Sequence, residues 1–245
     1  MKILYILLLS FPSVAAVCQT NAWQLTTCND EWKPAKPKKA SFLLCSNRVN
    51  DTCYQFAYYN MFGPRIRVES FKDEKKSVRH GRWAYYYANG VIDSSGDYLN
   101  GAQHGIWLYR NQDGRITHMK EYYKGRFIKD SAIHVAEDNN VPLKPGEIES
   151  GYPGGSLAWQ HYLQKNFRFP PRAIDAGVGG EVRLQFVINK TGDIVDPEIS
   201  KSVEFSLDEE SMKIITGSGK WEPASKDGKP LNSYKIQPVK FVIIK

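Results

Sequence analysis

Apolar and polar residues alternate over residues 180–188 with the period of a β-strand. Apolar side chains occupy every second position there: Val182, Leu184, Phe186 and Ile188. Neighbouring side chains of a strand point to opposite faces of a sheet, so this spacing predicts a strand with one buried face. The short loop 189–193 contains Gly192 and is typical of a hairpin, with a return strand over 194–202.

Two helices are expected around this hairpin. The first opens in the turn Pro153-Gly154-Gly155 with Ser156 as its N-cap, and three apolar residues then share one face: Trp159, Leu163 and Phe167. The second begins at Ser206, where the S-x-x-E spacing to Glu209 indicates a capping box, and it ends at Gly217.

The last strand is predicted over residues 231–244 and contains Pro238. Its apolar residues change parity at that proline: Tyr234 and Ile236 share one parity, and Val239, Phe241 and Ile243 share the other. Because proline lacks the N–H donor, it belongs at a sheet edge or a bulge. We therefore expect an edge strand with a bulge or register change near Pro238, and such an edge can pair with an extended peptide.

An internal repeat of 24 residues precedes this region. Eight identities share the one offset: His80/His104, Gly81/Gly105, Trp83/Trp107, Tyr85/Tyr109, Gly90/Gly114, Ile92/Ile116, Tyr98/Tyr122 and Gly101/Gly125. The glycines suit hairpin turns, and one hairpin cannot bury its aromatic face alone, so the copies are expected to stack. Residues 80–127 resemble MORN and MORN-like variant repeats, a resemblance that implies an interaction surface.

The first residues have the pattern of a secretory signal, with Lys2, an apolar run over 3–9 and small residues up to Ala16. Cleavage after Ala16 is expected, and retention as a membrane anchor is the alternative. Lipidation of Cys18 is a further alternative, although Val17 before it is not the small residue that such sites use. Residues 17 to about 53 are expected to be irregular.

All four cysteines lie in the first quarter of the chain: Cys18, Cys28, Cys45 and Cys53. An even number in an exported chain suggests disulfides, with three connectivities open. Sequential pairing, Cys18 with Cys28 and Cys45 with Cys53, closes the shortest loops. None of the spacings is the C-x-x-C of a zinc or redox site.

The net charge of +7 favours acidic or anionic partners, and export argues against nucleic acid. One basic cluster, Lys33, Lys36, Lys38 and Lys39 with interspersed prolines, is interpreted as a solvated linker. His80 and His104 occupy equivalent turn positions without ligands around them, so neither a metal nor a cofactor is expected. The chain also lacks a G-x-S-x-G, an H-E-x-x-H or a phosphate loop, so we expect that it is not an enzyme.

Residues 152–245 resemble the TonB C-terminal domain, in the variety common in Bacteroidetes-type envelope proteins. The resemblance depends on the order and spacing of Tyr152-Pro153-Gly154-Gly155, Phe169-Pro170 with Ala173, 180–188, Gly192-Asp193, Leu207-Asp208-Glu209, Trp221-Glu222-Pro223, Gly228-Lys229-Pro230, and Pro238-Val239 with Phe241. It implies an αβ fold with a three-stranded sheet whose edge binds a short segment of an outer-membrane transporter.

By position, this resemblance places the partner-binding strand within 235–244 and implies these contact residues: Lys235, Ile236, Gln237, Val239, Phe241 and Ile243. The remaining motif residues are interpreted as structural: Phe169, Pro170, Trp221, Glu222 and Pro223. A classical energy transducer also has an N-terminal membrane helix and a long Pro-rich spacer. This sequence shows a cleavable signal and no such spacer.

The predicted fold class is α+β, a small antiparallel sheet with two helices after a β-hairpin repeat module. The expected domains are a signal at 1–16, a Cys-containing segment at 17–57, repeats at 58–129, a linker at 130–150 and the TonB-like domain at 151–245. The predicted function is a non-enzymatic periplasmic or envelope protein of a Gram-negative bacterium. It would bind an outer-membrane TonB-dependent receptor and serve transmembrane transport. The alternative is an interaction or scaffold protein without energy transduction.

Overall fold

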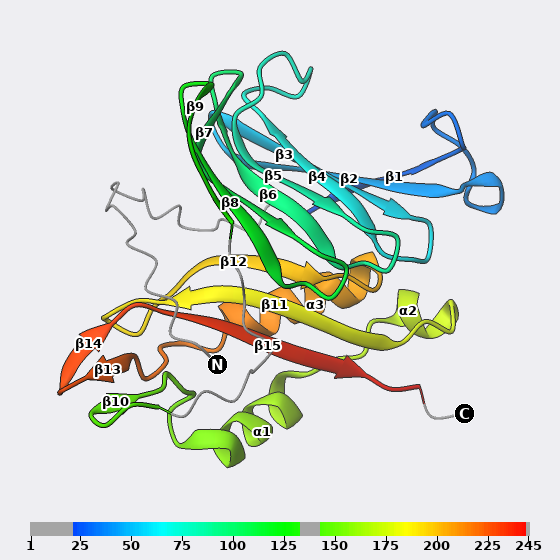
Figure 1. Cartoon of the computed structure of the whole chain (residues 1–245). Coiled ribbons are helices and arrows are strands. Elements are labelled where there is room, and N and C mark those ends of the chain that lie inside the picture. Colours follow the sequence, from blue (N-terminus) through cyan, green and yellow to red (C-terminus); the bar gives the residue numbers. More distant parts are fainter. Residues whose placement is uncertain (1–21, 133–142, 244–245) are drawn as a thin grey trace. The chain divides into compact units, whose positions relative to one another are not determined.

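The computed structural model describes residues 22–132 and 143–243, and the chain divides into two compact units (Figure 1). The N-terminal unit holds the sheet of residues 24–132 and also the short segment 202–205. The C-terminal unit holds the other described residues from 143 onward. The predicted signal segment lies outside the described residues.

The N-terminal unit is a single antiparallel sheet in which each strand pairs with the next along the chain. Its nine strands are β1 (Gln24–Cys28), β2 (Phe42–Asn50), β3 (Cys53–Asn60), β4 (Arg65–Phe71), β5 (Gly81–Tyr86), β6 (Ile92–Leu99), β7 (Ala102–Arg110), β8 (Ile116–Tyr123) and β9 (Arg126–Ala132). A short 3-10 helix, Pro37–Lys39, lies between β1 and β2.

Strand alternation sorts the side chains of this sheet onto two different faces. One face carries the core cluster around Leu43, Cys45, Tyr59 and Ile92, with Phe205 packed on it. The other, here called the aromatic face, carries Phe56, Tyr58, Phe71, Trp83 and Trp107, with partly buried tyrosines around them. A period of two along each strand therefore accounts for both clusters.

The 24-residue repeat is visible in the backbone. Gly90 and Gly114 both have positive φ (80° and 84°) and donate an N–H to the residue three positions earlier. Gly101 and Gly125 likewise have positive φ (89° and 83°), and each donates to a carbonyl 22 residues back at 2.8 Å. Glycine adopts this conformation without the strain that a Cβ adds. The structure shows the repeat but does not assign its family, so the resemblance to MORN repeats stays a prediction.

The two repeat tryptophans are buried and tie each hairpin to the preceding strand. Trp83 and Trp107 are 2% and 3% exposed. The indole N–H of Trp83 donates to the carbonyl of Ser70 at 2.9 Å, and that of Trp107 to the carbonyl of Asp97 at 3.2 Å. Trp107 lies over Gly96, where a Cβ would fall onto the indole ring.

The prediction that residues 17–53 are irregular is wrong for the part that the structure describes, because β1 and β2 extend the sheet through residues 24–50. The lysine cluster is not a linker either. Its loop is fixed by the hydrogen bond from the Thr27 hydroxyl to the carbonyl of Ala35 at 2.6 Å and by the Cys28–Pro34 bridge of the backbone.

The expected disulfides are not present among the cysteines that the structure describes, Cys28, Cys45 and Cys53. The pairing of β2 with β3 shows why Cys45 and Cys53 cannot join. Cys45 faces Ala57, four residues along β3 from Cys53, which is about 13 Å of strand. A disulfide needs Cα atoms within about 7 Å. Cys18 lies outside the described residues.

The C-terminal unit contains two small sheets and three helices. The helices are α1 (Gly155–Asn166), α2 (Pro171–Asp175) and α3 (Phe205–Thr216). One sheet has the order β12-β11-β15, built from β11 (Gly180–Ile188), β12 (Ile194–Lys201) and β15 (Ser233–Phe241). The other, which the sequence did not indicate, joins β10 (Glu147–Ile148), β13 (Ala224–Lys226) and β14 (Lys229–Leu231).

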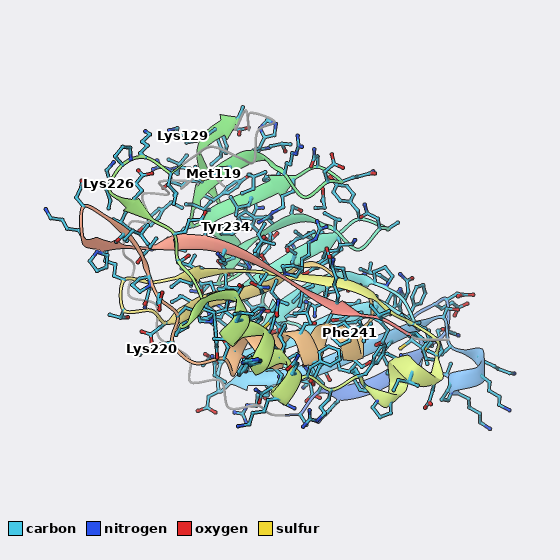
Figure 2. All side chains as sticks on the ribbon, turned by 90° about the horizontal axis from the view of Figure 1, so that it is seen from below. Met119, Lys129, Lys220, Lys226, Tyr234 and Phe241 are labelled. Atoms are coloured by element: carbon cyan, nitrogen blue, oxygen red, sulfur yellow. The ribbon has the colours of Figure 1, made fainter. Side chains whose placement is uncertain are left out.

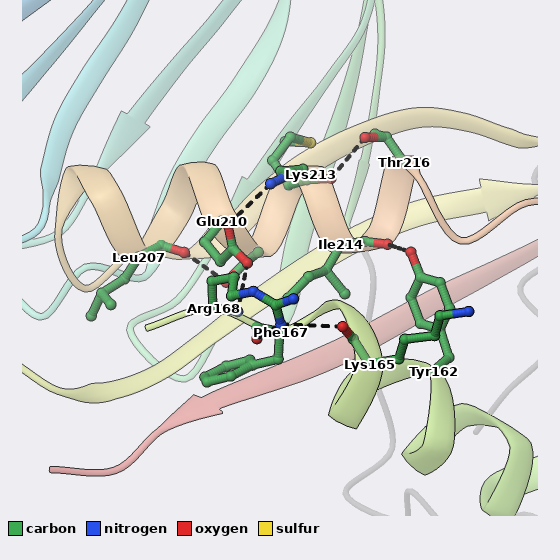
Figure 3. Close-up of polar contacts among 11 residues, drawn as sticks. Tyr162, Lys165, Phe167, Arg168, Leu207, Glu210, Lys213, Ile214 and Thr216 are labelled. Atoms are coloured by element: carbon green, nitrogen blue, oxygen red, sulfur yellow. Dashed lines mark hydrogen bonds and ion pairs between the residues drawn. The ribbon is translucent and has the colours of Figure 1, made fainter. Parts of the chain in front are cut away.

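The core of this unit forms where the alternating residues of β11 meet the helices. Val182, Leu184, Phe186 and Ile188 are all buried, as their spacing predicted, together with Leu207 and Ile215 of α3. Polar contacts join the helices (Figure 3): the Tyr162 hydroxyl donates to the carbonyl of Ile214 at 2.9 Å, and the main-chain N–H of Arg168 donates to Glu210 at 2.9 Å.

Both helix starts differ from the prediction. Gly154, with φ 78°, is the N-cap of α1, so Ser156 lies inside the first turn. The helix α3 begins at Phe205, so the predicted cap Ser206 lies inside its first turn.

We expect Gly96→Ala to lower the free energy of unfolding of the N-terminal unit by about 1–3 kcal/mol, because the added methyl group overlaps the Trp107 indole. Urea denaturation followed by tryptophan fluorescence measures the change. The same substitution in a Trp107→Leu background should cost much less. An equal cost in both backgrounds would contradict the packing explanation.

Candidate functional site

The strand β15 is an edge of the main C-terminal sheet. All nine of its residues pair with β11, from Ser233 facing Ile188 to Phe241 facing Gly180. Among the strands that the structure describes, β15 has no second neighbour. Figure 2 labels two of its residues, Tyr234 near the start and Phe241 at the end. The structure thus places the predicted binding strand at an open edge.

The register of β15 also shows which of its side chains are buried. Val239 and Phe241 are each 2% exposed, whereas Ile236 is 42% exposed. The predicted inner position of Ile236 is therefore wrong, because one parity faces the core along the whole strand. Val239 and Phe241 belong to the core of the domain, and Ile236 belongs to the surface.

The bulge expected at Pro238 is absent, since Pro238 faces Arg183 in an unbroken ladder. An antiparallel strand turns the main-chain groups of alternate residues toward the two sides. A proline leaves the ladder intact when its missing N–H would point away from β11. The carbonyl of Pro238 accepts from the side-chain amide of Gln237 at 3.3 Å, which agrees with an outward direction.

This geometry assigns a direction to each main-chain group of β15. Residues of the same parity as Pro238, including Ile236 and Lys240, turn their N–H and C=O groups toward the open edge. Residues of the other parity, including Gln237 and Val239, bond to β11. The open edge therefore offers alternating donors and acceptors, with one donor missing at Pro238.

The other predicted contact residues lie around this edge. The Lys235 ammonium group donates to the carbonyl of Ser150 at 3.0 Å, and Gln237 is partly buried. Ile243 follows the end of the strand and is 36% exposed. Lys240 forms an ion pair with Glu181 at 3.5 Å, and Arg183 and Lys240 together lower the pKa of the Glu181 carboxyl, Arg183 more strongly.

The motif residues interpreted as structural support β15 and the helices. The ring of Phe169 meets that of Phe241 edge-on at 5.6 Å, and Pro170 precedes α2 as its N-cap. Trp221 packs on Phe186 at 5.4 Å. Glu222 exchanges two backbone hydrogen bonds with Gly151, of 2.8 and 3.0 Å, and Pro223 follows directly before β13.

The opposite edge of the sheet is less regular. On β12, Asp196 has a positive φ of 51°, Pro197 follows it, and the pairing with β11 shifts register twice. Both edges carry a proline, but the register shifts occur on β12 alone, and bulges of this kind hinder strand addition. Of the two edges, β15 is the one with a continuous ladder.

Sequence reasoning missed a buried polar chain on the main sheet. The Tyr234 hydroxyl donates to Gln185 at 2.6 Å, and the Gln185 amide donates to Glu198 at 2.6 Å. Gln185 and Glu198 are both buried. Alternation placed Gln185 on a solvent face, and only the cross-strand register brings these three residues together.

The hairpin turn after β11 explains another motif. Within it, Asn189 accepts backbone N–H groups from Thr191 and Asp193. Gly192 accepts the N–H of Trp221 at 2.8 Å, and a Cβ at Gly192 would meet the Trp221 carbonyl. Lys220 pairs with Asp193 at 2.8 Å, and Lys220, Thr191 and Asn189 lower the pKa of that carboxyl to about 2.

The repeat histidines have matching roles in the backbone. The Nδ1 atom of His80 accepts the N–H of Asn100 at 3.5 Å, and that of His104 accepts the N–H of Lys124 at 3.4 Å. Within residues 22–132 and 143–243, no group of three His, Cys, Asp or Glu side chains is arranged to hold a metal. The helices in these same ranges include none that is long and apolar enough to cross a membrane.

The C-terminal unit is thus a small αβ domain with one regular, open sheet edge. Residues 165–243 match the family of the Gram-negative bacterial TonB protein C-terminal, which identifies this part as a TonB C-terminal domain. The NMR structure of the Helicobacter pylori TonB C-terminal domain is similar at 22% identity and a TM-score of 0.29, covering 38% of this chain and 88% of that one. The comparison with curated proteins gave no match.

We expect Asp193→Asn to remove stability only where the wild-type carboxylate is ionised. Its pKa is about 2 in the folded state and about 3.9 in the unfolded chain, so its contribution is complete above about pH 4 and is lost as the pH falls toward 2. The urea midpoints of variant and wild type should differ at pH 6 and converge near pH 2. Asp175→Asn, on α2, controls for the loss of one carboxylate. Curves that stay parallel down to pH 2 would contradict the assignment.

Proposed function

We propose that this protein binds an extended segment of an outer-membrane TonB-dependent receptor by adding it as a strand to β15. The observation that carries the proposal is the continuous, open edge of β15 within a TonB C-terminal domain. In this role the protein acts in the periplasm and serves TonB-dependent transport, and it performs no catalysis of its own.

The edge suits a peptide ligand in two ways. Outward main-chain groups at Ile236, Pro238 and Lys240 give hydrogen bonds that do not depend on the ligand sequence. The side chains of Ile236 and Lys240 are exposed beside them, so an apolar or acidic residue of the ligand gains a contact. Val239 and Phe241 take part only indirectly, because their side chains hold β15 in the core.

A second candidate function is an envelope interaction protein without energy transduction. The observation that favours it is the nine-stranded sheet, which fills residues 24–132 and lies outside the matched residues 165–243. Membrane attachment through a retained signal or a lipidated Cys18 distinguishes the two, because transduction needs an anchor. The mature N-terminus, determined on protein isolated from the envelope, decides this point: a soluble chain that starts at Val17 excludes the anchored transducer.

The binding proposal is tested with Ile236→Pro. This substitution removes an outward N–H, so it should leave the β11 ladder intact and weaken binding of receptor-derived peptides by about tenfold or more. Ile236→Ala is the matched control, because it removes the same side chain and keeps the N–H. Isothermal titration against synthetic receptor segments from the same genome gives the affinities.

A third variant, Gln237→Pro, checks the direction of the main-chain groups. It removes an N–H that bonds to β11, so it should destabilise the domain by about 3 kcal/mol or more, by analogy with proline in regular structure. Equal affinities for Ile236→Pro and wild type, both folded by circular dichroism, would refute strand addition to β15.

A further inference from the structure

The aromatic face of the N-terminal unit carries a regular row of tyrosines. Successive cross-strand pairs run Tyr58–Arg67, Arg67–Tyr85, Tyr85–Ser94, Ser94–Tyr109 and Tyr109–His118. One line across the sheet therefore passes through Tyr58 on β3, Tyr85 on β5 and Tyr109 on β7. These strands lie two apart in the sheet (Figure 1).

The row has a fixed period. Neighbouring strands lie about 4.8 Å apart, so tyrosines on alternate strands recur about every 10 Å. The 24-residue repeat produces this spacing, since Tyr85 and Tyr109 are equivalent positions of the two copies. A ligand that follows the row would present similar groups at the same interval.

Packing explains the tryptophans of this face and also Tyr58, which is 5% exposed, so Tyr85 and Tyr109 are the members of the row that a ligand can reach. Trp83 and Trp107 are buried and hydrogen-bonded to the backbone of neighbouring strands. The tyrosines Tyr54, Tyr85, Tyr98, Tyr109 and Tyr122 stay partly exposed. Burial, followed by the neighbouring Tyr122, raises the pKa of Tyr109 to about 12, so its phenol is protonated and can donate a hydrogen bond.

Basic side chains lie over these rings. The guanidinium of Arg67 lies 3.8 Å from the ring centre of Tyr58. The ammonium of Lys76 lies 4.2 Å from the ring centre of Phe56, and the ammonium of Lys120 lies 4.9 Å from the ring centre of Tyr109. Arg79 lies 4.9 Å from the ring of Trp83. The acidic groups beside them are Glu69, 3.0 Å from Arg67, and Asp130, 3.9 Å from Lys120. The four cations outnumber these two carboxylates.

We propose that the aromatic face binds an acidic, β-1,4-linked glycan strand of the bacterial cell wall. In such a strand a disaccharide unit is about as long as the tyrosine period. Every second sugar carries a carboxyl group, which is a free carboxylate wherever no peptide is attached to it. The C–H face of a sugar ring can pack on a tyrosine ring, phenols can bond its hydroxyls, and Arg67 and Lys120 attract its carboxylates. This surface is separate from β15, so the proposal is independent of receptor binding.

The test measures binding of the purified full chain to three glycans: intact cell-wall sacculi, glycan strands freed of their peptides by an amidase, and neutral chitin oligosaccharides. The double variant Tyr85→Ala/Tyr109→Ala should bind the peptide-free strands about tenfold more weakly, while Tyr85→Phe/Tyr109→Phe keeps the rings and most of the binding. Tyr123→Ala is the matched control, because Tyr123 is 51% exposed on β8 and has the other parity from Tyr122.

Three results distinguish the outcomes. The proposal is supported if the chain binds peptide-free strands more tightly than chitin oligosaccharides. This binding should also fall in the alanine double variant but not in Tyr123→Ala. Binding to intact sacculi alone overturns it, because the ligand is then the peptide. Equal binding by a folded alanine double variant, checked by near-ultraviolet circular dichroism, also overturns it. Peptide binding at β15 should be unchanged in every variant of this face.

Discussion

The uninterrupted pairing of β11 with β15 determines the organisation of the C-terminal unit. Nine consecutive residue pairs fix the register, and the register fixes which side chains of β15 enter the core. Val239 and Phe241 are buried as a result, and the rings of Phe167 and Phe169 pack on Phe241 at 5.0 and 5.6 Å. The motif at Phe169 and Pro170 therefore stabilises the strand whose other side is open.

The same ladder gives Pro238 a simple explanation. In the interior of a sheet this residue would remove a hydrogen bond, whereas at an edge it removes a donor that faces solvent. Proline on an edge also discourages pairing between copies of a protein, because an approaching strand finds one donor missing. The strand β15 thus pairs regularly with β11, while its open side lacks one hydrogen-bond donor.

Strand alternation and the glycine turns of the repeat were read correctly from the sequence, whereas the helix starts and the patterns that depend on distant partners were not. The burial of Val182 to Ile188 follows from alternation alone, and the hairpins of the 24-residue repeat follow from glycines that need positive φ. The inner parity of β15 was misread because Ile236 and Val239 are both apolar, and only pairing with β11 decides between them. Similarly, Ser206 has the local signal of a cap, but α3 begins one residue earlier, at Phe205.

The candidate site shows the same division. An edge strand near the C-terminus was predictable from Pro238, and the resemblance of residues 152–245 supplied its role as a prediction. Which main-chain groups face outward was not predictable, because it requires the cross-strand register. The strands β1 and β2 were missed since their residues acquire strand structure by pairing along the sheet, and that pairing keeps Cys45 and Cys53 too far apart for a disulfide.

The direction of the β15 ladder has a mechanical consequence. Hydrogen bonds of an antiparallel pair lie perpendicular to the strands. A strand bound along β15 and pulled along its own axis would load all of its hydrogen bonds together, in shear. A pull at one end, at right angles to the strand, would break the hydrogen bonds one after another by peeling and would need far less force. The same bound segment could therefore resist tension in one direction and release readily in another.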